Sequence, residues 1–443
     1  MTLVKGLCSR SPALLAIVIL TSALVGTPGP AHATGGSATT PESWALVTSE
    51  HPDRAHHVKY EPVWDGDDDA VVGRTEQPEN ITRAFFQLKV SQLAGKRVFE
   101  AALALGIRDG SDCGTQIEVW ETTAIDPLTT WNRQPQWLRK LSTTTPRMTC
   151  PSISPILHII TQAVQDAAAR GDEYLTIGLK SADESSPGRR LYRTAPYRGN
   201  RGPGLVTQYN TAPDVPSVLA VRSDCYTGPD AGRYVRTAIP VLRATATDPD
   251  SSTSGEPLRV RFEWADRSGA KLGEAVTLET QSSSPHCVTV PAGQLAEDGT
   301  YTWRARAENL WRTENPDGAG WLEGWDYSAW TPWQPEFTVD TTRPSQPLVS
   351  STDFPEGQAG GRVGVPGRFT LSPNGSQDVA MYVYSFSGGP AGRVQADADG
   401  SAVLAFTPKW TWPDKLTVES IDRAGNRSSA TSYEFWASPA DAR

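Results

Sequence analysis

Short segments in which apolar and polar residues alternate are the feature that most restricts the fold of this chain. Residues 83–90 read RAFFQLKV, so that alternate positions of this segment can face a common core. A period of two residues is that of a β-strand with one buried face. Turn-forming residues follow at 91–96, and further strands are expected at 98–105 and 115–121. We expect this stretch, which closes on residues 131–135, to form the spine of a β-sandwich.

Helical periodicity is confined to one segment. In residues 157–170, Ile160, Ala163 and Ala167 fall on one helical face, and Gly171 is positioned to end the helix. A single surface helix among short strands is typical of a jelly roll. Other segments have strand character, and in the later part of the chain we expect strands at 239–246, 258–264, 287–290, 301–307, 333–339, 369–371, 381–386, 402–406, 415–421 and 432–436.

The chain is too long for one sandwich, because 443 residues predict about three domains. Proline-containing linkers separate them at 211–216 (TAPDVP) and 340–344 (DTTRP), since proline does not pair inside a sheet. We predict an all-β chain with an N-terminal jelly-roll-like sandwich and two immunoglobulin-like sandwiches. The predicted segments are a signal peptide at 1–33, a flexible leader at 34–42 and domains at 43–212, 217–341 and 344–443.

An export signal is predicted at the start of the chain. Lys5 and Arg10 supply positive charge ahead of an apolar run at 13–25, and Ala31–Ala33 is an A-x-A cleavage site. The mature chain is therefore expected to begin near Thr34 and to be secreted. The apolar run is shorter than the roughly 20 residues that span a bilayer, and no longer run follows, so we expect no transmembrane anchor.

Cysteines of the mature chain are predicted to form disulfides, because thiols tend to oxidise outside the cytosol. Their positions are Cys113, Cys150, Cys225 and Cys287. Such a set permits three connectivities, and if each domain folds as a unit, Cys113 pairs with Cys150 and Cys225 with Cys287. Each bridge would stabilise the fold by about 3 kcal/mol. A structural zinc site is disfavoured because the chain has no C-x-x-C pair.

Several segments of the predicted first domain are similar to the DNRLRE family of secreted jelly-roll modules, which includes carbohydrate-binding modules. They are 83–88 (RAFFQL), 93–96 (LAGK), 130–135 (TWNRQP) and 203–210 (PGLVTQYN). The resemblance implies a jelly-roll sandwich and a carbohydrate ligand, and it assigns no binding residue.

The two later domains resemble other extracellular modules. Residues 248–250, 262–264 and 299–307 of the second domain are similar to fibronectin type III modules of actinobacterial secreted proteins, with Tyr301 as the expected tyrosine corner. Residues 422–426 (DRAGN) of the third domain are similar to a bacterial immunoglobulin-like repeat. Both resemblances imply sandwiches without a catalytic centre of their own.

Candidate ligand-binding residues lie in two loops. Trp311, Trp321 and Trp325 occupy an extended loop at 309–329, where exposed indoles would stack on sugars or anchor a protein partner. The alternative is that they cover the sandwich. Arginines gather in a second loop, where they would bind an anionic glycan or wall polymer by bidentate contacts, or form a solvated basic loop. The arginines are Arg189, Arg190 and Arg193. Trp120 and Trp131 are expected in the core or under the turn at Pro135.

An acidic loop is the candidate metal site. Asp65, Asp67 and Asp69 alternate along it, and carboxylates so spaced can converge on Ca²⁺. The alternative is a solvated acidic loop. We expect no other cofactor.

The predicted function is attachment without catalysis. A net charge of -9 disfavours nucleic acid as a partner. No nucleophile elbow or H-E-x-x-H motif occurs, so no catalytic residue is assigned. We expect a secreted, non-catalytic adhesion protein that binds an extracellular or cell-wall polysaccharide through its first domain. The alternatives are an adhesion module that binds a cell-surface protein through the loop at 311–325, and an accessory fragment of a larger hydrolase-type assembly.

Overall fold

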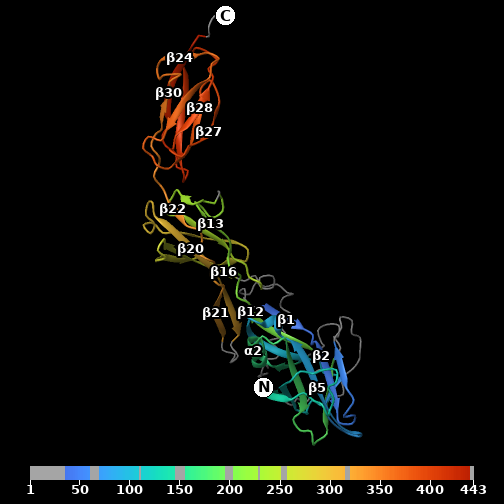
Figure 1. The fold of residues 1–443 in the computed structure, drawn as a ribbon. Helices are drawn as coiled ribbons and strands as arrows, with labels where there is room; N and C mark the ends of the chain where they lie inside the picture. The colour runs from blue at the N-terminus through green and yellow to red at the C-terminus, as the bar shows by residue number, and fades with distance from the viewer. Residues whose placement is uncertain are drawn as a thin grey trace, which may run out of the picture. The chain divides into compact units, whose positions relative to one another are not determined.

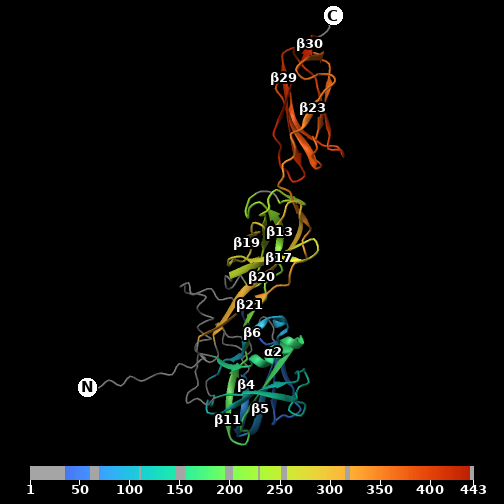
Figure 2. The same ribbon diagram turned by 90° about the vertical axis from the view of Figure 1, so that its left-hand side faces the viewer.

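The computed structural model describes residues 35–59, 69–108, 111–144, 155–194, 203–227, 230–250, 257–314 and 320–439. Backbone contacts divide them into two compact units. Unit 1 holds the described residues up to Pro213 together with those in Asp248–Leu258 and Asn309–Tyr327, and unit 2 holds the rest. The fold is all-β, as predicted, and Figures 1 and 2 show sandwiches of paired sheets. Among the described residues, no helix has the length and apolar character needed to cross a bilayer.

The first sandwich faces a four-stranded sheet against an eight-stranded one. The smaller sheet has the order β1 (Gly35–Thr39), β12 (Gly204–Asn210), β6 (Arg97–Leu105), β9 (Ile156–Ile159). The larger has the order β11 (Gly188–Arg193), β4 (Asp69–Glu76), β5 (Glu79–Lys89), β10 (Tyr174–Ser181), β7 (Ile117–Thr122), β8 (Trp137–Thr143), with β2 (Ser43–Thr48) on β5 and β3 (His56–Lys59) on β2. A short 3-10 helix at Ser91–Leu93 links β5 to β6.

The core of this sandwich lies between its sheets. Phe86 and Leu88 of β5, Leu103 of β6 and Ile177 of β10 are fully buried in it. Ala84, Phe86, Leu88 and Val90 thus face inward, as the alternation in residues 83–90 predicts.

Two expectations for this sandwich were wrong. The predicted helix at 157–170 is shorter, because Ile156–Ile159 pairs with β6 and only Thr161–Arg170 forms α2, which Gly171 ends with a φ of 73°. Branched side chains favour the strand there. The leader at 34–42 is not all flexible, because Gly35–Thr39 pairs along β12, where the Ser37 and Thr207 hydroxyls lie 2.8 Å apart.

The second sandwich has the strand arrangement of immunoglobulin-like folds. One sheet has the order β13 (Ser217–Arg222), β15 (Val241–Thr245), β19 (Pro285–Thr289). The other has the order β14 (Tyr234–Val235), β22 (Phe337–Val339), β20 (Thr300–Glu314), β16 (Pro257–Asp266), β17 (Lys271–Val276), with β18 (Thr280–Gln281) on β16 and β21 (Trp321–Tyr327) on β20. The predicted strand at 333–339 is shorter in the structure, where only Phe337–Val339 forms a strand.

Disulfide bonding agrees with the prediction where the structure describes it. Cys225 and Cys287 form a disulfide, with Cα atoms 5.7 Å apart. Cys113 is also disulfide-bonded, whereas Cys150, its predicted partner, lies outside the described residues.

Tyr301 forms the tyrosine corner expected from the sequence. Its ring is buried against Phe337, and its hydroxyl oxygen accepts a 2.7 Å hydrogen bond from the Ala296 backbone N–H. This bond ties the start of β20 to the preceding loop.

Replacing Tyr301 with Phe is therefore expected to lower the free energy of unfolding by about 1 kcal/mol, because the Ala296 N–H loses its acceptor. Urea denaturation followed by fluorescence measures the change. Tyr226→Phe is the control, since the Tyr226 side chain is largely exposed. Equal midpoints for Tyr301→Phe and the unmodified chain would contradict the assignment.

The third sandwich repeats this arrangement at residues 348–438. One sheet has the order β23 (Leu348–Ser350), β25 (Gly367–Ser372), β28 (Ala402–Phe406). The other has the order β24 (Ala359–Arg362), β30 (Thr431–Ser438), β29 (Asp414–Asp422), β26 (Val379–Phe386), β27 (Ala391–Gln395). Its core is rich in aromatic rings, with Phe369 at the centre of the contacts.

Candidate ligand-binding face of the first sandwich

Aromatic and cationic side chains alternate on one face of the eight-stranded sheet. The Arg83 guanidinium carbon lies 4.6 Å from the ring centroid of Trp131 and 5.8 Å from that of Trp137. The Lys180 ammonium nitrogen lies 4.9 Å from the Trp137 centroid and 4.6 Å from that of Trp120. Trp131, Arg83, Trp137, Lys180 and Trp120 therefore form one continuous set, here termed the cation–aromatic row.

Strand register brings these residues together. Gly178 of β10 lies opposite Phe85 of β5 and opposite Trp120 of β7. A Cβ atom at Gly178 would lie only 2.8 Å from a Trp137 ring carbon. Glycine at this position thus allows the Trp137 indole to lie close to β10, between the two cations of the row.

The indoles of the row are each partly buried. The Trp137 ring packs against Phe85, with centroids 5.2 Å apart, and against the edge of Trp120 at 6.1 Å. Trp131 and Trp137 border a small apolar cluster that contains Phe85 and Ile125. Trp120, Trp131 and Trp137 remain partly accessible to solvent. Flat, apolar surface is therefore available to a ligand along the row.

The Glu118 carboxylate forms an ion pair with a cation of the row, since it lies 3.7 Å from the Lys180 ammonium nitrogen. Glu118 accepts hydrogen bonds from Trp120 Nε1 at 2.9 Å and from Lys140 Nζ at 2.7 Å. Burial alone would raise the pKa of Glu118, but these hydrogen bonds and the charges of Lys140 and Lys180 outweigh it and lower the pKa. Glu118 therefore stays ionised at neutral pH.

Arg83 is fixed at the other end of the row. Its Nε and Nη2 atoms donate to the two carboxylate oxygens of Glu184 at 2.8 and 2.5 Å, and Nη1 donates to Gln134 Oε1 at 2.9 Å. A guanidinium held in this bidentate way keeps one orientation over Trp131.

The expectation that Trp120 and Trp131 fill the core or pack under the Pro135 turn holds only in part, because Trp131 packs against the small apolar cluster of Phe85 and Ile125 but neither indole lies in the core between the sheets. Both side chains lie on the outer face of the larger sheet and contact cations. The sequence signal for Trp120 is its phase, because it alternates with the buried Ile117 and Val119 and shares a face with Glu118. Trp131 lies in a loop and gives no such signal.

The predicted tryptophan loop is a β-hairpin formed by β20 and β21, and its residues 309–327 belong to unit 1. Trp311 is partly buried, with its ring 5.2 Å from that of Phe99 on β6 and 5.2 Å from the Arg97 guanidinium. Trp321 lies at the start of β21 and is 54% exposed, and Trp325 is partly buried. The three indoles thus differ in exposure.

Polar contacts join the same hairpin to the rest of unit 1. Arg97 forms an ion pair of 2.6 Å with Asp326, whose carboxylate also accepts from Asn210 Nδ2 at 2.8 Å. Asn309, which is fully buried, donates to Asp248 Oδ2 at 2.8 Å. These contacts give the hairpin a defined position within unit 1.

The three candidate arginines do not gather on one surface. Arg190 is 1% exposed, and its Nη2 atom donates to the Cys113 carbonyl, because alternation along β11 turns its side chain inward. Arg190 is therefore a core residue and not a ligand contact, which corrects the prediction. Arg189 is exposed and Arg193 partly buried.

The acidic loop is only partly described. Asp65 and Asp67 lie outside the described residues. Asp69 begins β4, and its carboxylate accepts a 2.9 Å hydrogen bond from Arg108. Calcium binding by this loop remains a prediction.

Comparisons with known proteins add little beyond the fold. No protein-family model matches the chain, and no curated protein is similar to it in sequence. Among solved structures, it is similar to the fibronectin(III)-like modules of Clostridium thermocellum CbhA, with 15% identity over 49% of this chain and 94% of that one and a TM-score of 0.27.

Two further solved structures show the same limited similarity. A two-domain fibronectin type III segment of chicken tenascin has 17% identity over 50% of this chain and 99% of that one, with a TM-score of 0.19. A β-glucuronidase from Ruminococcus gnavus has 11% identity over 75% of this chain and 48% of that one, with a TM-score of 0.19.

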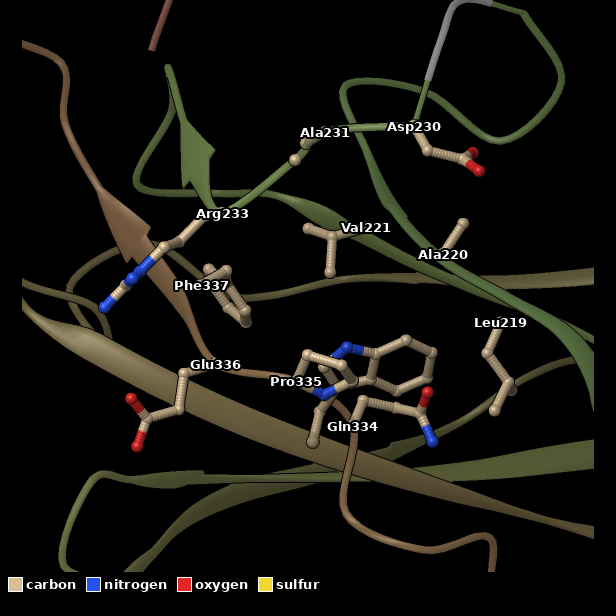
Figure 3. Close-up of a pocket in the computed structure, with 12 residues that line it drawn as sticks. Leu219, Ala220, Val221, Asp230, Ala231, Arg233, Gln334, Pro335, Glu336 and Phe337 are labelled. Carbon is tan, nitrogen blue, oxygen red and sulfur yellow. The ribbon is translucent and has the colours of Figure 1, made fainter. Parts of the chain in front are cut away.

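A cavity of about 550 Å³ opens in the second sandwich, beside β13 and β22. Figure 3 shows Val221 and Phe337 among its apolar lining residues, with Arg233 and Glu336 on one side and Asp230 on the other. A ligand site combines such apolar surface with polar groups that point at one position. In the described lining, the charged groups are spread apart, so the cation–aromatic row is the stronger candidate.

Proposed function

We propose that this chain is a non-catalytic binding protein that attaches to an extracellular polysaccharide through the cation–aromatic row of its first sandwich. The observation that carries the proposal is the partly exposed indoles of Trp131, Trp137 and Trp120, which alternate with fixed cations. The export signal and the resemblance to DNRLRE modules support an extracellular role and a carbohydrate ligand.

The chemistry of the row suits a sugar chain. The C–H face of a pyranose ring is apolar and flat enough to stack on an indole. Sugar hydroxyls both donate and accept hydrogen bonds, and the Glu118 carboxylate and Lys180 ammonium stand beside Trp120 to satisfy them. A row of three indoles offers successive stacking positions to an extended polymer.

Charge on this face favours a polysaccharide that bears acidic groups. The cations are Arg83, Lys140 and Lys180, and the carboxylates are Glu118 and Glu184, so three positive and two negative charges leave one positive charge. The whole chain carries -9. Arg83, Lys140 and Lys180 thus carry one charge more than their carboxylate partners, which favours carboxylated or phosphorylated polymers over neutral ones.

Replacing Trp120 with Ala is expected to weaken polysaccharide binding about tenfold, or about 1.4 kcal/mol, because one stacking surface is lost. Affinity electrophoresis of the full chain in gels that contain acidic and neutral polysaccharides measures the change. Trp120→Phe should keep most of the affinity. Trp412→Ala is the matched control, because this indole is 70% exposed but lies in the third sandwich.

Two outcomes would reject the proposal. One is a correctly folded chain that no polysaccharide retards. The other is unchanged retardation of the Trp120→Ala, Trp131→Ala double variant with an unchanged circular dichroism spectrum. Release of reducing ends from a bound polysaccharide would contradict the proposal that the chain is non-catalytic.

The hairpin is a second candidate surface, and the observation that favours it is the exposure of Trp321 and Leu322 on β21. An exposed tryptophan suits a protein contact, since tryptophan is enriched among the residues that dominate protein interfaces. Trp321→Ala belongs in the same set of variants. If Trp321→Ala abolishes attachment to cells and Trp120→Ala does not, protein adhesion through the hairpin replaces polysaccharide binding.

A further inference from the structure

Three aspartate carboxylates converge in unit 2. Asp340 follows β22, Asp378 precedes β26, and Asp422 is the last residue of β29. One carboxylate oxygen from each lies within 4.8 Å of the other two. Asp340 and Asp422 are buried, and Asp378 is partly buried. The three carboxylates thus share a small, largely dehydrated space.

One buried carboxylate oxygen of the cluster has no partner among the described residues. Asp422 is 2% exposed, and its Oδ1 atom accepts a 2.8 Å hydrogen bond from the Asn426 backbone N–H. Its Oδ2 atom is also buried and accepts no hydrogen bond. A buried carboxylate oxygen without a partner is costly, so this atom indicates a ligand with positive charge.

Electrostatics point in the same direction. Burial, which is the largest cause, and the negative charges of neighbouring acids together raise the pKa of Asp340 to about 6; the acids are Asp422, Asp378, Glu297 and Asp298. In the described part of the chain, no lysine or arginine forms an ion pair with the three clustered aspartates. Mutual repulsion of the carboxylates is therefore not relieved by a side chain.

The surrounding backbone holds the cluster in place. Asn426 Nδ2 donates to the carbonyl oxygens of Asp340 at 2.9 Å and Thr342 at 3.3 Å. The Arg423 backbone N–H donates to the Asp378 carbonyl at 3.1 Å. The segment after β22 and the turn after β29 are thus tied together before any ion binds, which lowers the cost of assembling the site.

We propose that Asp340, Asp378 and Asp422 bind a calcium ion. Calcium takes six to eight oxygen ligands in flexible geometry, and carboxylates that bind through one or both oxygens, with water, provide them. Magnesium requires near-ideal octahedral geometry and releases its bound water reluctantly. A buried cluster therefore suits magnesium less well than calcium. None of these three aspartates belongs to the acidic loop at 65–69 or to the cation–aromatic row.

Calorimetric titration of the chelator-treated full chain with calcium chloride tests the proposal. We expect Asp422→Asn and Asp378→Asn each to weaken calcium binding at least tenfold, because each removes a charge from the ion. Asp399→Asn is the matched control, since this aspartate lies in the same sandwich but is exposed and bonds to Ser401. The double variant Asp65→Asn, Asp67→Asn removes any calcium binding by the acidic loop. Calcium binding by Asp340, Asp378 and Asp422 should be unchanged in this variant.

Two further readouts guard against a misfolded variant. Calcium should raise the unfolding temperature of the unmodified chain but not that of Asp422→Asn, whereas in chelator the variant should be at least as stable, because one buried charge is gone.

Three results would overturn the proposal. They are the absence of calcium binding to the unmodified chain at millimolar concentrations, unchanged affinity in Asp422→Asn, and tighter binding of magnesium than of calcium. The first two results would exclude the site. The third would exclude calcium as the ion that the site prefers.

Discussion

Replacing Phe369 with Ala is expected to lower the free energy of unfolding of the third sandwich by about 4 kcal/mol. Its ring is 0% exposed, and its centroid lies 4.8 Å from that of Phe435, 5.5 Å from Phe386, and 5.7 Å from both Phe354 and Tyr433. Truncation to Ala removes apolar contact with all four rings and leaves a cavity that they cannot close. This position is therefore where the third sandwich is most sensitive to loss of volume.

Urea denaturation followed by tryptophan fluorescence measures this loss. Phe369→Leu should cost less, because the smaller side chain keeps part of the contact. Trp412→Ala, on the surface of the same sandwich, should change stability by no more than about 0.5 kcal/mol. A loss below about 1 kcal/mol for Phe369→Ala would show that the rings do not form a common core.

Replacing Glu308 with Ala is expected to destabilise the second sandwich by about 3 kcal/mol or more. Its side chain is 0% exposed, and its carboxylate lies 2.7 Å from both Arg259 and Arg261 and 3.3 Å from Arg306. Burial would raise the pKa of Glu308, but the hydrogen bonds from Arg261 and Arg259 outweigh it and lower the pKa. Without the carboxylate, the arginines repel one another across β16 and β20.

Glu274→Ala is the control for this experiment, because that carboxylate also meets Arg261 but is exposed, and exposed pairs contribute about 0 to 1 kcal/mol. The pKa of Glu308 is lowered on folding, so its stabilisation is present above its unfolded pKa and is lost as the pH falls through its folded pKa. The difference between the unmodified chain and Glu308→Ala should therefore shrink in acid. Equal losses for the two substitutions would contradict a special role for the buried carboxylate.

Much of the fold follows from local patterns in the sequence. Alternation in residues 83–90 gives both the strand and its buried face, and the turn residues between later strands mark most of their ends. The helix prediction failed at its first turn, because residues 156–159 (ILHI) fit both the strand and the helix periodicity, and pairing with β6 decides for the strand. Likewise, the glycine-rich segment 35–39 becomes a strand because β12 offers it an open edge.

The candidate sites were harder to predict, since they depend on register between distant strands. Trp120 and Lys180 are 60 positions apart in sequence and meet because β7 pairs with β10. Asp340, Asp378 and Asp422 come from three different segments, and no spacing rule joins them. The arginine prediction failed for Arg190 for the opposite reason, since adjacent residues on a strand point to opposite faces.

The boundary between the two units lies inside a single strand, because Glu308 of β20 belongs to unit 2 and Asn309 to unit 1. Domains that fold independently can recombine at their linkers without the loss of stabilising contacts. Here, a crossover at 211–216 would separate Phe99 from Trp311 and Asn210 from Asp326, which contact each other in unit 1. We therefore expect the first two sandwiches to have been duplicated, transferred and lost as a pair over evolution.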